Sequence, residues 1–300
     1  MSFTVKATIA SFGGKLFKLT HPSTSTGTPM ALNLFLPPSC FTPPSGGPSP
    51  PFKFQIKNPL LIYLSGLTCT PDNCTEKGFL QSRAAHHNLA ILYPDTSPRG
   101  LNLPNESSSY DFGVAASFYL DATQPPWSEH YRMETYLTQE LPQLLFGDAE
   151  FGKYLDRERV SITGHSMGGH GALTLYLRNP GMYQSVSAFA PIANPSKCPW
   201  GEKAFAGYLG GDREVWKGHD ATELVKGWGG EGFEGVGGCW EGDGFYKEGQ
   251  LLPENLEAAA RRGRWRVEVR YQDGYDHSYF FIASFAKDHV DHAAKHLGLL

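Results

Sequence analysis

Short apolar stretches recur along the chain and alternate with amphipathic ones. Apolar residues at nearly every position are typical of strands that a parallel sheet buries on both faces. This pattern predicts central strands at residues 59–66, 89–95, 159–164, 184–191 and 265–272. Nearer the N-terminus, residues 5–20 and 28–36 predict two further strands, joined by a polar turn at 21–27.

Helical patterns lie between the predicted strands. They cover residues 76–87, 132–146, 167–178, 253–262 and 279–297. Strands that alternate with helices indicate an α/β fold, with a mainly parallel central sheet and helices on both of its faces. The sequence shows no internal repeat and no long linker after residue 51, so we expect residues 1–300 to form a single domain.

Two segments interrupt this pattern. Residues 37–51 hold seven prolines and two glycines and predict an exposed loop; a polyproline ligand for another domain is the alternative. Residues 227–244 hold nine glycines. Within them, residues 227–232 match GxGxxG, but the strand before and the helix after that a dinucleotide site requires are missing. A nucleotide-binding oxidoreductase is therefore disfavoured.

Composition narrows the class of protein. Of 300 residues, 40% are hydrophobic and 19% charged, as in ordinary globular proteins, and the net charge of −4 offers no general attraction for nucleic acid or an acidic membrane. No run approaches the ~20 apolar residues of a membrane span, and the first residues lack the apolar core of a secretory signal. Five cysteines, an odd number without a CxxC pair, favour a reducing compartment, and we expect a cytoplasmic protein.

The sequence GHSMG at residues 164–168 is the strongest chemical signal. It follows a β-branched run and precedes an Ala/Leu-rich helical pattern. A G-x-S-x-G turn between strand and helix is the nucleophile elbow of α/β-hydrolases, in which the serine stands above the carboxyl edge of the sheet. Ser166 is therefore the predicted nucleophile, the alternative being a serine in an inert tight turn.

A serine nucleophile requires a base and an acid, which follow it in that fold in the order acid, then histidine. His277 lies between the last predicted strand and the last predicted helix, as the base should. Asp243 is the preferred acid, and Asp220 and Asp212 are the alternatives. Asp220, followed by Glu223, also fits a helix N-cap. Three histidines of the last helix could share one face: His289, His292 and His296. Their spacing resembles a metal cluster, but we interpret them as a solvated face near the C-terminus, and the chain has no HExxH motif.

An oxyanion hole requires two backbone donors. One is the N–H of the residue after the nucleophile, Met167. The other is assigned to Leu67, in the loop of residues 65–70 that follows the strand at 59–66.

Longer motifs carry a resemblance to a known family. They are LSGLTCTPDNCTEKG, PDTSPRGLN, DFGVAASFYLDATQPPW, YRMETYLTQELP, GHSMGGHGALT, CPWGEKAFAGYLG, GQLLPEN and GYDHSYFF. With these motifs the sequence resembles the S-formylglutathione hydrolases, the esterase D family of α/β-hydrolases, from about residue 59 to the C-terminus and more loosely over residues 5–36. The resemblance implies a single α/β-hydrolase domain that hydrolyses S-formylglutathione to glutathione and formate without a cofactor or metal, with side activity on small esters. It also implies a homodimer.

The resemblance assigns the nucleophile to Ser166, the base to His277 and the acid to Asp243, seven residues before Gln250. One departure concerns the acid. The residues before Asp243, EGFEGVGGCWEG, make a poor strand by propensity, where the family has an apolar one. A lineage difference, a different acid or a faulty translation of this stretch would each explain it.

Two further residues are candidates for the substrate pocket. Trp200 is either a core aromatic or a wall that narrows an acyl pocket to fit a formyl group. Cys69, beside the predicted oxyanion loop, is either a small buried residue or a thiol near the site. The rival functions are a general short-chain carboxylesterase and, if the acid is absent, a non-catalytic binding protein of the same fold.

Overall fold

The computed structural model describes residues 2–41, 57–228, 234–239, 242–263 and 266–300. Residues 42–51 of the predicted proline-rich loop lie outside them, as do residues 229–232 of the GxGxxG match. The first part of that loop, Pro38–Cys40, is a 3-10 turn, η1.

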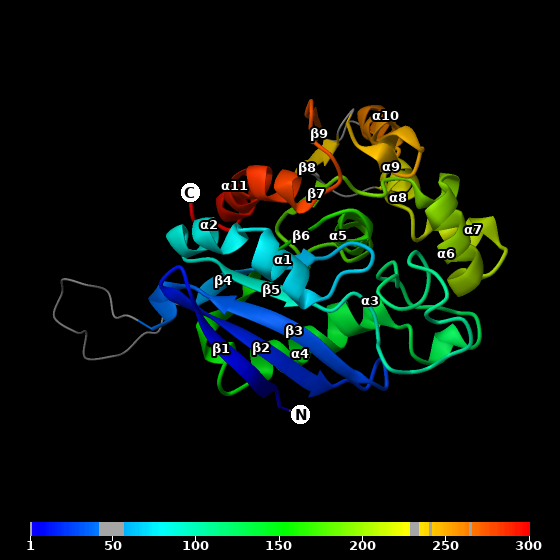
Figure 1. Ribbon diagram of the computed structural model, residues 1–300. Helices are drawn as coiled ribbons and strands as arrows, with labels where there is room; N and C mark the ends of the chain where they lie inside the picture. The colour runs from blue at the N-terminus through cyan, green and yellow to red at the C-terminus, as the bar shows by residue number, and fades with distance from the viewer. Residues whose placement is uncertain (1, 42–56, 229–233, 240–241, 264–265) are drawn as a thin grey trace.

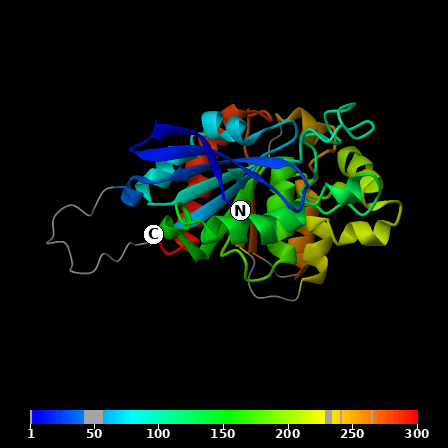
Figure 2. The same cartoon turned by 90° about the horizontal axis from the view of Figure 1, so that it is seen from below.

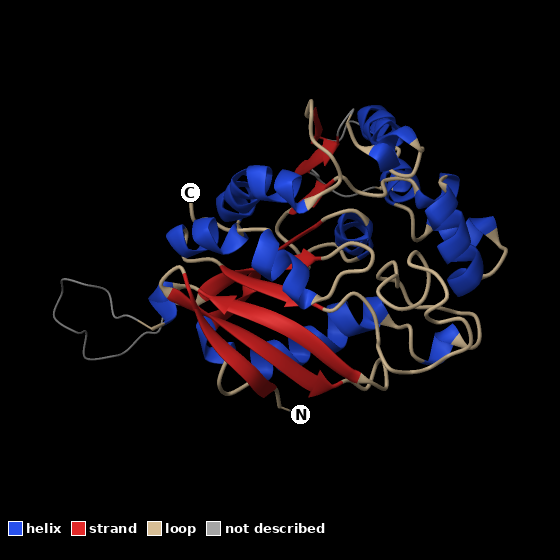
Figure 3. Cartoon of the chain, viewed as in Figure 1, coloured by secondary structure: helices blue, strands red, loops and turns tan. Residues whose placement is uncertain are grey.

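A single mixed sheet runs through the described residues (Figures 1 and 3). Its strands lie in the order β1-β2-β3-β5-β4-β6-β7-β8-β9. The bounds are β1 Thr4–Ser11, β2 Gly14–Pro22, β3 Pro29–Leu36, β4 Asn58–Leu64, β5 Ala90–Pro94, β6 Leu155–Gly164, β7 Val186–Phe189, β8 Glu234–Cys239 and β9 Arg266–Tyr271. Antiparallel pairing joins β1 to β2, β2 to β3 and β3 to β5, whereas the strands from β5 to β9 pair in parallel. The predicted α/β fold with a mainly parallel sheet is confirmed.

Residues 5–20 form a hairpin and not the single strand that the pattern predicted. Phe12 and Gly13 both adopt positive φ, 45° and 78°, between β1 and β2. Gly14 then begins β2 so close to β3 that a Cβ there would lie 2.2 Å from the Leu36 carbonyl oxygen. Phe12 and Gly13 therefore reverse the chain, and Gly14 allows β2 to start close to β3. The continuous alternation of side chains on either side conceals this turn.

Helices cover both faces of the sheet. The α-helices are α1 Pro71–Lys77, α2 Leu80–His86, α3 Met133–Thr135, α4 Leu141–Gly147, α5 Met167–Arg178, α6 Pro199–Leu209, α7 Arg213–Lys217, α8 Ala221–Gly227, α9 Gly244–Lys247, α10 Pro253–Gly263 and α11 Tyr279–His296. A π-helical turn, Tyr136–Glu140, joins α3 to α4. Helices α1, α2 and α11 pack together over one face, and α4, α5, α8 and α10 cover the other (Figure 2). The sequence pattern located α5, α10 and α11 closely and, through the helix N-cap expected at Asp220, the start of α8, but it did not predict α6.

The glycine-rich segment contains β8, where sequence propensity argued against a strand. The backbone of Glu234–Cys239 pairs in parallel with β7 on one side and with β9 on the other. A strand held by two neighbours gains ladder hydrogen bonds on both edges, and these outweigh the poor propensity of glycine. Asp243 therefore follows a strand of the central sheet.

Candidate active site

The carboxyl ends of five parallel strands supply the site. Because strands β4, β6, β7, β8 and β9 run in the same direction, their C-terminal ends lie at one edge of the sheet. The loop of residues 65–70 follows β4, the elbow follows β6, Asp243 follows β8 and His277 follows β9. This edge is where ligands bind in open α/β sheets.

Ser166 lies on a strained turn between β6 and α5. Its φ and ψ are 57° and −121°, a conformation that non-glycine residues rarely adopt. The backbone crossing is too close for side chains on either side, since a Cβ on Gly168 would lie 2.0 Å from the Leu64 carbonyl oxygen. The Ser166 N–H donates to the Phe189 carbonyl oxygen at 2.9 Å, which ties the turn to the end of β7. The strand–turn–helix elbow predicted at residues 164–168 is present.

Asp243 and His277 meet across the ends of β8 and β9. His277 Nδ1 lies 2.6 Å from Asp243 Oδ2. The other carboxylate oxygen, Oδ1, accepts the backbone N–H groups of Phe245 at 2.8 Å and Tyr246 at 3.4 Å, so Asp243 also caps α9. The Asp243 side chain is fully buried, and that of His277 is 14% exposed. The carboxylate is thus fixed by the helix on one side and orients the imidazole on the other.

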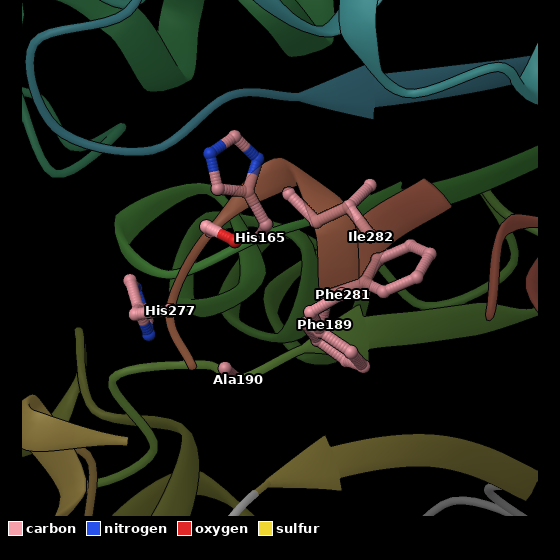
Figure 4. A pocket seen from close by; sticks show the side chains of 7 residues that line it. His165, Phe189, Ala190, His277, Phe281 and Ile282 are labelled. Carbon is pink, nitrogen blue, oxygen red and sulfur yellow. The ribbon is translucent and has the colours of Figure 1, made fainter. Parts of the chain in front are cut away.

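His277 lines a small pocket to which His165, the residue before the nucleophile, also contributes (Figure 4). The Nε2 of His277 is buried and has no hydrogen-bond partner among the residues that the structure describes. The pocket is lined by His165, Phe189, Ala190, His277, Ser278, Phe281 and Ile282. His165 immediately precedes Ser166 in the chain. His277 lies near enough to His165 to contribute to the lowering of the His165 pKa. A histidine held at Nδ1 and unpaired at Nε2 beside the elbow has the geometry of a general base.

The two expected oxyanion donors come from the loop after β4 and from the start of α5. Met167 is the first residue of α5, and the first N–H groups of a helix have no partner within it. In the loop, the Thr68 N–H donates to the Ala115 carbonyl oxygen at 3.1 Å and the Cys69 N–H to that of Gly66 at 3.4 Å. The N–H of Leu67, the residue before Thr68, makes no hydrogen bond within the part of the chain that the structure describes.

Cys69 is a buried thiol at the end of the oxyanion loop. Its Sγ lies 3.6 Å from the Tyr279 hydroxyl and 3.8 Å from His165 Nε2. Burial raises the pKa of this thiol, so the neutral form dominates near pH 7. These features fit the first of the two interpretations, a small buried residue that packs under the site.

Trp200 belongs to an aromatic row that leads to His277. Its indole packs on Phe245 with ring centroids 4.6 Å apart, and Phe245 meets the His277 ring edge-on at 5.0 Å. On its outer side, Trp200 Nε1 donates to the hydroxyl of Tyr110 at 3.2 Å. The sequence pointed to Trp200 but not to Phe245 or Tyr110. Phe245 could have been suspected, because it lies two residues after the predicted acid.

The alternative acids occupy helix N-termini away from His277. Asp212 caps α7, and Asp220 caps α8 by accepting the Glu223 N–H at 3.2 Å, as the sequence predicted. Asp220 is fully buried and its Oδ2 also accepts from Ser196 and Asn194. Burial raises the pKa of this carboxyl. Of the three candidate acids, Asp243 is the one whose carboxylate hydrogen-bonds His277 in the described structure.

The expected solvated histidine face on the last helix is wrong for His289. Its ring is buried and stacks on Phe189 with centroids 3.5 Å apart. The sheet explains the burial, because α11 packs against β6 and β7. Within the described residues, no group of three His, Cys, Asp or Glu side chains is placed to hold a metal ion. None of the helices there combines the length and the apolar character needed to cross a membrane.

Buried histidines make the fold sensitive to mild acid. Burial lowers the pKa of His165 and His170 to about 3 and that of His219 to about 4. Each is neutral when folded but binds a proton when unfolded below pH ~6.5. The contribution of these histidines to the free energy of unfolding is therefore fully present above pH ~6.5. It is lost as the pH falls toward their pKa values in the folded protein. Between pH 7.5 and 5.5 we expect a loss of about 1.4 kcal/mol per histidine in the free energy of unfolding, measured by urea denaturation. Equal urea midpoints at the two pH values would contradict the lowered pKa values of these histidines in the folded protein.

Comparison with known proteins agrees with the fold. The "Esterase" family model matches residues 23–292. The S-formylglutathione hydrolase of Rattus norvegicus is 47% identical over 95% of each chain, and that of Arabidopsis thaliana is 45% identical over 96% of this chain and 95% of its own. A solved S-formylglutathione hydrolase from Agrobacterium tumefaciens superposes with a TM-score of 0.88 at 39% identity, covering 99% of this chain and 100% of that one.

Sheet topology, elbow and family model together define an esterase of the α/β-hydrolase fold. The chain belongs to the S-formylglutathione hydrolase family.

Proposed function

We propose that this protein hydrolyses the thioester S-formylglutathione to glutathione and formate, with Ser166 as nucleophile, His277 as general base and Asp243 as the acid that orients it. The observation that carries the proposal is the 2.6 Å contact between His277 Nδ1 and Asp243 Oδ2, made beside the Ser166 elbow in a chain of this family. Relatives at 45–48% identity are named for this activity.

The first half of the reaction forms an acyl-enzyme. Ser166 Oγ attacks the thioester carbonyl carbon while His277 Nε2 takes the hydroxyl proton. The carbonyl oxygen becomes an oxyanion, which the N–H groups of Leu67 and Met167 stabilise. Asp243, an acceptor at His277 Nδ1, keeps the proton of the neutral ring on that nitrogen and stabilises the imidazolium that forms. The carbon–sulfur bond then breaks, and the thiolate leaves readily because a thiol has a pKa of about 8.5. The departing sulfur takes the proton from His277 Nε2, which returns the ring to its neutral form for the second half of the reaction.

The second half returns the enzyme to its first state. Water attacks the formyl ester on Ser166, and His277 takes one proton from that water. A second oxyanion forms at the same two N–H groups. The bond between the carbonyl carbon and Ser166 Oγ then breaks, and His277 returns the proton to the serine. The product leaves as formic acid, which releases its remaining proton to water and becomes formate. This chemistry employs side chains and backbone donors of the chain alone.

The aromatic row beside His277 suits a small acyl group. Phe245 contacts the His277 ring, and Trp200 packs behind it, so large side chains occupy the space on that side of the base. We propose Trp200 as a wall of the acyl pocket. A narrow pocket would favour formyl over acetyl and butyryl groups.

We expect kcat/KM to fall in the order S-formylglutathione, S-acetylglutathione, S-butyrylglutathione. Each added methylene in a pocket that resists it costs ~10–200-fold. Steady-state kinetics with the three thioesters, with p-nitrophenyl acetate and butyrate as reference esters, measure the series. Equal specificity constants for the formyl and butyryl thioesters would favour a general short-chain carboxylesterase. Saturable binding of the thioesters without turnover would favour a binding protein.

We further infer a cytoplasmic, homodimeric protein built as one domain. In the described part of the chain, Cys40, Cys69, Cys74 and Cys198 carry free thiols, which a reducing compartment preserves. The homodimer rests on the family resemblance. Light scattering after gel filtration tests the dimer, and a single cooperative unfolding transition tests the single domain.

A further inference from the structure

His165 is buried between the elbow and the oxyanion loop. Its Nε2 lies 3.1 Å from the backbone nitrogen of Gly66, which donates to it, and its Nδ1 lies 2.9 Å from the hydroxyl oxygen of Tyr63. Tyr279, in α11, meets the ring edge-on with centroids 5.3 Å apart. Figure 4 shows this ring standing on the elbow at the border of the pocket that also contains His277. One side chain thus contacts β4, the loop after it and the first turn of α11.

The hydrogen bonds of His165 fix its tautomer. A backbone N–H can only donate, so Nε2 must accept and the ring proton must be on Nδ1, where it is donated to Tyr63. Burial lowers the pKa of His165 to about 3, so the ring is neutral near pH 7. A protonated ring would direct an N–H group at the Gly66 N–H. The neutral form is therefore the form that holds the loop.

Close approach at Gly66 adds to this fit. A Cβ on Gly66 would lie 2.8 Å from His165 Nε2 and 3.0 Å from Ser166 Cβ, so any other residue would displace the loop from the elbow. Other hydrogen bonds hold the same loop from residues outside the elbow, such as the one that Tyr119 Oη donates to the Ser65 carbonyl oxygen at 2.7 Å. Among these, the bond to His165 joins the loop to the residue next to the nucleophile.

We propose that His165 is a positioning residue, which fixes the loop of residues 65–70 to the elbow and thereby sets the separation of the two oxyanion donors, Leu67 and Met167. The inference rests on the proposed function, because it assigns His165 a part in the same reaction. Leu67 and Met167 follow β4 and β6, two strands that pair directly in the sheet. The His165 ring links the two turns that follow these strands. Donors must lie 2.7–3.1 Å from the developing oxyanion, so even a small movement of the loop weakens the interaction that lowers the barrier.

Two amide substitutions separate positioning from mere packing. The glutamine oxygen in His165→Gln reaches about as far as Nε2 and can still accept the Gly66 N–H. The shorter amide in His165→Asn reaches the position of Nδ1 and cannot. We expect His165→Asn to lower kcat for S-formylglutathione by roughly 10–100-fold with KM changed less than about 3-fold, and His165→Gln to retain kcat within about 5-fold.

Inhibitor binding gives a readout that a structural role would not move. A trifluoromethyl ketone thioether of glutathione forms a tetrahedral adduct with the serine and places an oxyanion in the hole, whereas S-methylglutathione does not. In His165→Asn, the affinity of the ketone should fall in proportion to kcat/KM, and that of S-methylglutathione should stay within about 2-fold. Equal losses for both inhibitors, or equal kcat in the Asn and Gln variants, would overturn the positioning role.

Tyr63→Phe keeps the test decisive if His165→Asn does not fold. This variant removes the acceptor for the Nδ1 proton and leaves the ring in place, so the tautomer that holds Gly66 is no longer fixed. We expect kcat to fall by roughly 3–10-fold at unchanged KM, and unchanged kcat in Tyr63→Phe would overturn the proposal. An inactive wild-type protein would instead refute the proposed function, so the two failures are distinguishable.

Discussion

Replacing Ser166 with alanine is expected to lower kcat for S-formylglutathione and for p-nitrophenyl acetate by at least roughly 10⁴-fold. The elbow gives this serine a strained backbone, with φ 57° and ψ −121°, at the start of α5 and beside the loop that contains Leu67. Without the hydroxyl no acyl-enzyme can form, and only binding and the oxyanion donors remain to assist attack by water. Rates of the purified variant at matched folded fraction measure the effect.

Ser161→Ala is the matched control for this variant. Ser161 is also buried on β6, where its hydroxyl hydrogen-bonds that of Ser185 at 2.9 Å, away from the carboxyl end of the strand. The control should lose about 1 kcal/mol of stability and keep its kcat. Near wild-type turnover in Ser166→Ala would show that the nucleophile has been misassigned.

Asp243→Asn is expected to lower kcat by about 10⁴-fold while the fold is retained. The amide oxygen can replace Oδ1 as the cap of α9, accepting from Phe245, but the amide nitrogen then faces His277 Nδ1. A donor at that position forces the imidazole proton onto Nε2, so the ring can no longer take the proton of the serine. The pH–rate profile and kcat of the variant, with circular dichroism as the check of folding, measure this effect.

Asp220→Asn is the comparison that isolates catalysis from burial. Asp220 is as deeply buried as Asp243. Its carboxylate accepts hydrogen bonds from Ser196, Asn194 and the first turn of α8, which it caps, instead of contacting His277. The asparagine amide would turn its N–H groups toward groups that are themselves hydrogen-bond donors. We therefore expect the free energy of unfolding to fall by about 1–3 kcal/mol and kcat to stay within about 3-fold of wild type. A helix cap alone contributes about 1 kcal/mol, so the burial of Asp220 accounts for the larger expected loss. An inactive Asp220→Asn beside an active Asp243→Asn would reverse the assignment of the acid.

Local sequence was sufficient for the parts of the fold that depend on local chemistry. Parallel strands are buried on both faces and so read as apolar runs, which located β4, β5 and β6. The elbow was predictable because close backbone crossings demand glycine at 164 and 168. The turn at Gly13 was not predicted, because alternation of side chains continues through the hairpin.

Long-range contacts set the limit of prediction. Propensity argued against β8, yet pairing with β7 and β9 makes its backbone a strand, and only this pairing places Asp243 next to His277. The aromatic contact of Phe245 with His277 joins residues far apart in sequence. The bond between His165 and Gly66 likewise spans about a hundred residues, and no local pattern indicates it.

The most direct test of the account is the hydrolysis of S-formylglutathione by the purified wild-type protein, followed as the release of both glutathione and formate. We predict equal amounts of the two products at a rate that is proportional to enzyme concentration and saturates with substrate. A folded protein that leaves the thioester at its uncatalysed rate of hydrolysis would contradict the central claim.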